Sequence, residues 1–185
     1  MQVALYQGKS GVSRAIRWLT RGPYSHAAFH LDERSAAVAA ALARRGEVFA
    51  KLQFTGEGAV VEAWSCGVRN VRSLSAQHTP GTTVDLYDLD PPLSPHEEAE
   101  LLRRLDEVIG TPYDWLDVLY FVALFRLLTG RNHHKTGRLF CSCLLFKLLL
   151  AIGRTLFRRT QPWEVPPSWL QRSTGIKYRE TVVTT

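Results

Sequence analysis

Residues 24–31 read YSHAAFHL, and their side chains form two alternating sets with a period of two residues. This period predicts a β-strand, because successive side chains of a strand point to opposite faces of a sheet. His26, Ala28 and His30 would share one face, and residues 25, 27 and 29 would share the other. The predicted strand therefore presents two imidazoles on a single face.

Further strands are predicted on both sides of this segment. The sequence AVVEAW, residues 59–64, is rich in apolar and β-branched residues and is bounded by Gly58 and Gly67. Weaker patterns predict strands at 2–6, 47–54, 68–72 and 82–89. Two helices interrupt the series, a short basic one at 11–20 and an alanine-rich one at 33–45, which we interpret as an insertion between strands.

The second half of the chain is predicted to be mainly helical. Ser94 can cap a helix that begins at Pro95, and Glu97 completes a capping box. Two more helices are expected after it, at 111–128 and 141–152, with a polar loop at 129–138 between them and a last strand in the tail. Strands early in the chain and helices late indicate an α+β fold, which we assign to one domain spanning 1–185.

Composition narrows the classes of function. The chain has 185 residues, with 23 Lys and Arg against 17 Asp and Glu, which gives a formal net charge of +6. This charge favours an anionic partner such as a membrane surface, but no DNA- or RNA-binding motif accompanies it, so no nucleic-acid partner is expected. The first residues do not resemble a signal peptide, and no stretch reaches the roughly 18 uninterrupted apolar residues of a spanning helix. We therefore expect a cytoplasmic protein, or one delivered by a phage or as an effector; no oligomeric state is indicated.

Two of the three cysteines stand one residue apart in LFCSCLLF, residues 139–146. Cys141 and Cys143 are too close for an ordinary structural disulfide, which fits a reducing compartment. If a helix begins near Cys141, its thiol lies in the first turn, where free backbone N–H groups and the positive end of the helix dipole favour a thiolate. Both cysteines could instead be small buried apolar side chains. A zinc site with His133 and His134 is another alternative, although its spacing is not a standard one.

A cysteine nucleophile requires a base, and the base requires a group that orients it. His26 is a candidate base on the predicted strand. Glu62 is unusual because it places a carboxylate inside the apolar strand at 59–64. If Glu62 faces His26, it can accept the imidazole N–H and fix the tautomer. The alternative is that Glu62 points into solvent.

Taken in order, four segments resemble a known family: GPYSHAAFHL (22–31), AVVEAWSCGV (59–68), GTPYDW (110–115) and RLFCSCLLF (138–146). They resemble the circularly permuted NlpC/P60 papain-like superfamily, in particular its YiiX/YebB-like group, with lecithin:retinol acyltransferase-like proteins as distant relatives. The resemblance implies a papain-like fold, in which an antiparallel sheet or small barrel packs against C-terminal helices. Two features depart from the family pattern: Cys143 stands where the group often has glutamate, and the helix at 33–45 separates the two strands more than usual.

By these motifs, the resemblance implies that His26 is the base, Glu62 the orienting residue and Cys141 the nucleophile. Tyr24 and Ser142 are further candidates for an oxyanion or substrate-binding role. The implied reaction is hydrolysis or acyl transfer at an amide or ester bond of a peptide, an amide or an acyl lipid. Neither a metal nor an organic cofactor is implied.

The sequence leaves two other classes of function open. One is a binding module that keeps the papain-like fold without catalysis, and the other is a small zinc-binding protein. The basic charge and the apolar helices slightly favour an acyl or membrane-surface substrate, although core packing explains those helices equally well.

Overall fold

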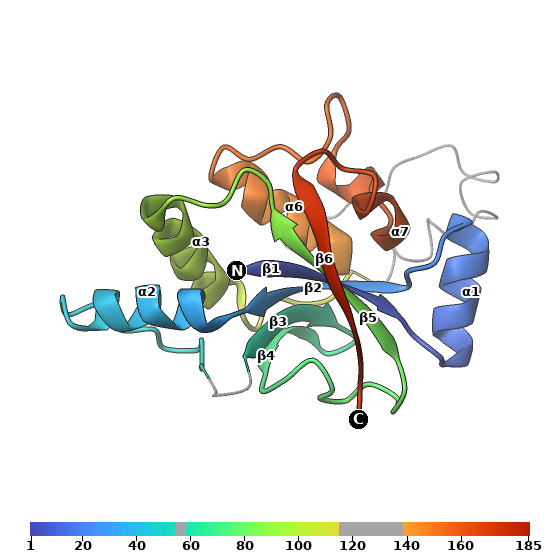
Figure 1. The fold of residues 1–185 in the computed structure, drawn as a ribbon, viewed down its shortest axis with the longest axis horizontal. Helices are drawn as coiled ribbons and strands as arrows, with labels where there is room; N and C mark the ends of the chain where they lie inside the picture. Colours follow the sequence, from blue (N-terminus) through green and yellow to red (C-terminus); the bar gives the residue numbers. More distant parts are fainter. Residues whose placement is uncertain (55–57, 115–138) are drawn as a thin grey trace.

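An antiparallel sheet organises the computed structural model, which describes residues 1–54, 58–114 and 139–185. In the described residues it has six strands, in the order β4-β3-β2-β1-β5-β6 (Figure 1). The strands are β1 (Gln2–Gln7), β2 (His26–Leu31), β3 (Ala59–Trp64), β4 (Gly67–Val71), β5 (Thr83–Leu89) and β6 (Ile176–Val183).

Helices lie at both ends of the sheet and across one of its faces (Figure 1). Those in the described ranges are α1 (Gly11–Thr20), α2 (Glu33–Ala43), α3 (Pro95–Val108), α6 (Cys141–Ala151), α7 (Pro167–Leu170) and the 3₁₀ turn η1 (Pro162–Glu164). The predicted capping box of α3 is present: Ser94 Oγ accepts from the Glu97 N–H, and Glu97 Oε2 accepts from the Ser94 N–H. The antiparallel sheet together with these helices confirms the predicted α+β class.

The main core lies between the sheet and helices α3 and α6. Leu5, Phe29 and Val61 are fully buried on this face of the sheet. They belong to one apolar cluster with Leu102 of α3 and Leu145 of α6. Each such side chain contributes about 1.5–3 kcal/mol by leaving water, so this face fixes the position of α6 against β2 and β3.

The opposite face of the sheet combines a small apolar cluster with polar side chains. Ala4, Ala28 and Val60 are buried in that cluster. The strand register pairs Tyr6 with His26 and Ala28 with Glu62, and directly paired residues lie on the same face. The register therefore places His26 and Glu62 together on this second face.

One strand prediction is wrong. Residues 47–54 form no strand, because the Asp106 carboxylate, not a neighbouring backbone, accepts hydrogen bonds from the N–H groups of Ala50, Lys51 and Leu52 at 3.1, 2.8 and 2.6 Å. The helix predicted at 111–128 lies outside the described residues beyond position 114, and the loop at 129–138 lies wholly outside them. In the part of the chain that is described, no helix has both the length and the apolar character needed to cross a bilayer.

Candidate active site

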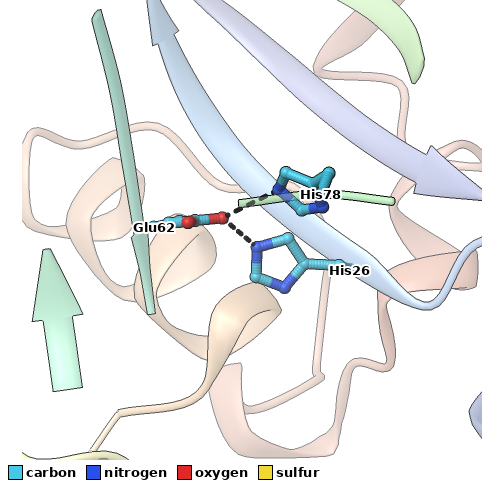
Figure 2. A group of neighbouring side chains, drawn as sticks. All are labelled: His26, Glu62 and His78. Carbon is cyan, nitrogen blue, oxygen red and sulfur yellow. Dashed lines mark hydrogen bonds and ion pairs between the residues drawn. The ribbon is translucent and has the colours of Figure 1, made fainter. Parts of the chain in front are cut away.

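His26 and Glu62 meet on adjacent strands. His26 is the first residue of β2 and Glu62 lies within β3, opposite Ala28. His26 Nε2 lies 2.6 Å from Glu62 Oε2 (Figure 2). Glu62 is 0% exposed and His26 is 8% exposed. The carboxylate is therefore not solvated by bulk water and depends on protein groups for its stabilisation.

Cys141 approaches the same imidazole from the other side. It is the first residue of α6 and is buried, and its side chain lies near enough to His26 to raise the pKa of that imidazole. Since His26 Nε2 is taken by Glu62, the second ring nitrogen, Nδ1, is the one left for the thiol. The N-cap residue of α6, Phe140, makes no side-chain hydrogen bond to the helix start. The structure thus brings together the three side chains of the predicted nucleophile, base and orienting residue.

The ionisation of His26 reflects these two partners. Burial lowers its pKa, but the interaction with the Cys141 side chain, together with the hydrogen bond and attraction to Glu62, outweighs burial and raises the pKa to about 9. The imidazole is therefore protonated at neutral pH and donates a hydrogen on each nitrogen.

Glu62 is ionised because cationic groups surround it. Burial raises its pKa, yet the hydrogen bond from His26 and the attraction of His26 and His78 hold the pKa well below its usual range. Arg69, directly opposite on β4, donates to Glu62 Oε1 from Nε at 2.9 Å and from Nη2 at 2.6 Å. Each carboxylate oxygen thus has its own set of donors, which fixes the carboxylate plane that orients His26.

The β3–β4 hairpin positions Glu62 and Arg69. Gly67 begins β4 with φ +120°, and a Cβ at this residue would lie 2.7 Å from the Thr111 carbonyl oxygen. The next residue, Val68, donates its N–H to that same oxygen at 2.8 Å. Glycine is therefore required where the hairpin docks against the segment that follows α3.

Aromatic rings enclose this polar cluster. His78 stacks on Tyr6 with ring centroids 4.1 Å apart, and Trp64 packs edge-on against His26 at 5.0 Å. The Arg69 guanidinium lies 4.6 Å from the centroid of Trp64. These rings exclude water and strengthen the charge interactions within the cluster.

Sequence reasoning missed Arg69 and His78. Arg69 could have been found, because a two-residue turn between 59–64 and 67–71 places it opposite Glu62. His78 lies in the segment between β4 and β5, and no periodic pattern indicates where its ring points. Its Nε2 lies 3.4 Å from Glu62 Oε2, aims at that carboxylate (Figure 2), and is buried without a hydrogen bond in the described part of the chain.

The two remaining predicted site residues direct their hydroxyls elsewhere. Tyr24 donates to Asp85 Oδ2 at 2.7 Å and lies 3.0 Å from the Tyr87 hydroxyl. Ser142 donates to the Val165 carbonyl at 2.6 Å. Within the described ranges, neither hydroxyl makes a hydrogen bond to Cys141 or His26.

The sequence also contains two cysteines besides Cys141, and the pair His133 and His134. Cys66 is exposed, whereas Cys143 is buried in the main core with Cys141. The alternative zinc ligands His133 and His134 lie outside the described residues.

No protein-family model and no curated protein matches this chain. Among solved structures, it is similar to a protein described as the metalloprotein yiiX from Escherichia coli O157:H7. The TM-score is 0.63 at 13% identity, over 98% of this chain and 96% of that one. The chain has a YiiX-like fold. At this identity the likeness concerns the fold alone; placement in the NlpC/P60 superfamily remains a prediction.

Proposed function

We propose that this protein is a cysteine-dependent hydrolase or acyltransferase with a permuted, papain-like NlpC/P60 fold. The observation that carries the proposal is the series in which the Cys141 side chain interacts with His26, and His26 hydrogen-bonds to Glu62. A thiol at a helix N-terminus, an imidazole and a buried carboxylate are the parts that a cysteine acyl-transfer site needs. The YiiX-like fold also supports the proposal, because the sequence motifs resemble the YiiX/YebB-like group.

The reaction follows from these positions. The Cys141 thiolate attacks the carbonyl carbon of an amide or ester, and a carbon–sulfur bond forms. His26 gives its proton to the leaving nitrogen or oxygen as the old bond breaks. Water or an acceptor alcohol or amine then attacks the thioester, returns a proton to His26 and releases the Cys141 thiolate. Glu62 remains ionised throughout and stabilises the positively charged imidazole.

The start of α6 supplies the site for the developing oxyanion. The backbone N–H of Cys141 lies in the first turn, where the helix has no internal acceptor for it. Together with one further donor it would stabilise a tetrahedral intermediate. The substrate is a peptide, an amide or an acyl lipid.

A thiol-directed electrophilic probe tests the proposal. At about pH 6, where free cysteines react slowly, Cys141 is expected to be labelled faster than Cys66 and Cys143. His26→Gln should slow the labelling of Cys141 and leave Cys66 unchanged. Cys66→Ser serves as the matched control, because it removes an exposed thiol outside the His26 series. If Cys141 is labelled at the same rate with and without the His26→Gln substitution, the proposal is refuted.

A metal site is the second candidate function, and one specific arrangement favours it. Single ligand atoms of His26, Glu62 and His78 all lie within 4.8 Å of one another (Figure 2). The similar structure is described as a metalloprotein. Imidazole and carboxylate are zinc ligands, and the buried Nε2 of His78 has no hydrogen bond in the described ranges.

The distances show what metal binding would require. Zinc bonds of about 2.0–2.1 Å place tetrahedral ligand atoms roughly 3.3 Å apart. The 3.4 Å between His78 Nε2 and Glu62 Oε2 fits that spacing, whereas the 2.6 Å between His26 Nε2 and Glu62 Oε2 does not. His26 would have to give up its hydrogen bond to Glu62, so the metal-bound form and the hydrolase form exclude each other. When bound, such an ion would supply Lewis-acid or structural stabilisation.

Equilibrium dialysis with zinc distinguishes the two candidates. The metal site predicts one zinc ion per chain, lost in His78→Ala, and slower probe labelling of Cys141 when zinc is bound. Absence of zinc binding would refute the metal site and leave the hydrolase proposal intact.

A further inference from the structure

Helix α1 has two chemically distinct faces, and none of its residues is buried. Val12, Ala15, Ile16 and Leu19 follow the i, i+3, i+4, i+7 spacing of one apolar stripe. Val12 is 64% exposed, although an apolar stripe on a surface helix normally packs against the core. Ala15 is also exposed, while Ile16 and Leu19 are partly buried, so in the structure as described this stripe is only partly covered by the protein.

The opposite side of α1 is basic. Arg14, Arg17 and Arg21 repeat at i, i+3 and i+7, and Lys9 precedes the helix. No acidic residue occurs anywhere in the sequence before Asp32. In the described parts of the chain, none of the three arginines has a carboxylate within ion-pair distance. Arg14 and Arg21 are exposed, whereas Arg17 is partly buried with its Nε covered, so the charge of Arg14 and Arg21 is available to an external anionic surface.

Trp18 lies at the boundary between these two sides and is 78% exposed. Its indole is apolar along most of the ring and carries one N–H donor, a combination that favours the interface between lipid headgroups and acyl chains. A partly exposed apolar stripe, a basic opposite side and a tryptophan at the boundary together are typical of a helix that lies in a membrane surface.

The residues that lead into helix α1 lie beside the start of β2, the strand that carries His26. The helix follows β1 directly, and Tyr6 near the end of β1 pairs with His26. The Gly8 N–H donates to Ser25 Oγ at 3.1 Å, which joins the lead-in of α1 to the residue before His26. Contact through α1 would therefore place a membrane at the end of the sheet where β2 begins with His26.

We propose that α1 docks the protein onto an anionic lipid bilayer, with its apolar stripe in the headgroup region and its arginines on the lipid phosphates. The charge complementarity selects an anionic membrane over a neutral one. This binding does not depend on the chemistry at Cys141.

Vesicle co-sedimentation tests the proposal on the full-length protein. Vesicles of phosphatidylcholine with roughly one third phosphatidylglycerol should bind it, and pure phosphatidylcholine vesicles should bind it much less. Since each exposed basic residue strengthens binding to an anionic surface by roughly fivefold, R14Q/R21Q should weaken binding about 25-fold. Trp18→Ala and Val12→Asp should also weaken it.

Matched controls lie at the end of α2, on the far side of the molecule from α1 (Figure 1). R44Q/R45Q removes two exposed arginines, and Val48→Asp changes an apolar side chain that is 86% exposed. Both are expected to bind vesicles like the original protein, and circular dichroism checks that every variant is folded.

The outcomes separate this proposal from the proposed function. Cys141→Ala should bind vesicles normally, because docking needs only α1. Equal binding to neutral and anionic vesicles, or α1 variants that bind as tightly as the α2 controls, would overturn the docking proposal. If probe labelling of Cys141 still depended on His26 in that case, the hydrolase proposal would stand.

Discussion

Replacing Glu62 with glutamine tests whether its charge keeps His26 protonated. The amide has nearly the same size, but its NH₂ group must face either His26 Nε2–H or the Arg69 guanidinium, which are both donors. At least one hydrogen bond to a charged group is therefore lost, and such bonds contribute about 1.5–3 kcal/mol. Because 1.36 kcal/mol corresponds to one pKa unit, the pKa of His26 should fall by about 1–2 units from its value of about 9.

The assay is an NMR titration of the imidazole C–H resonances. The His26 signal is identified by its loss in His26→Gln. Glu47→Gln is the matched control, because Glu47 also accepts two hydrogen bonds from one arginine, Arg103, but on the surface. The control should leave the His26 titration unchanged.

The stability of the protein should follow the same titration. Since folding raises the pKa of His26 from about 6.5 to about 9, its charge stabilises the fold fully below about pH 6.5. That contribution is lost as the pH rises through 9. Urea denaturation between pH 6 and 10 should show the loss, and Glu62→Gln should lower stability at pH 7 by about 3–5 kcal/mol, because Arg69 loses its buried charge partner. An unchanged His26 pKa in Glu62→Gln would refute the role given to the carboxylate.

Three further substitutions have expected outcomes. Ser142→Ala removes the donor to the Val165 carbonyl and should lower the free energy of unfolding in urea by about 1–3 kcal/mol while Cys141 is labelled at the original rate; slow labelling would assign Ser142 to the chemistry. His78→Asn removes the ring stacked on Tyr6 and should cost about 0.5–1.5 kcal/mol, so a more stable variant in thermal unfolding would contradict that packing. Asp106→Ala removes the acceptor for the N–H groups of 50–52, and hydrogen exchange should become faster there; unchanged exchange would show that the carboxylate does not hold this segment.

The sheet could be predicted from the sequence where side chains alternate. The period of two at 24–31 and the apolar run at 59–64 are local patterns, and they placed His26 and Glu62 on strands. Their common face follows only from the register between β2 and β3, which the pairing of Ala28 with Glu62 sets. The family resemblance supplied the expectation that Cys141 joins them.

Other parts of the structure depend on contacts between distant segments. Residues 47–54 have strand-like composition, but Asp106 on α3 accepts three of their N–H groups, and no local pattern reveals that acceptor. His78 owes its position to stacking on Tyr6, about 70 residues away in the chain. Arg69 is intermediate, since the turn geometry places it opposite Glu62 once the hairpin is recognised.

The start of α6 has a consequence for mutational tolerance. Phe140 is 1% exposed and belongs to the core, and its ring cannot accept a hydrogen bond from the first backbone N–H groups of the helix. A serine or aspartate at this residue would leave a void in the core and also occupy those N–H groups. In a saturation-mutagenesis selection, large apolar residues should therefore survive at position 140, and small polar residues that usually favour a helix start should be eliminated.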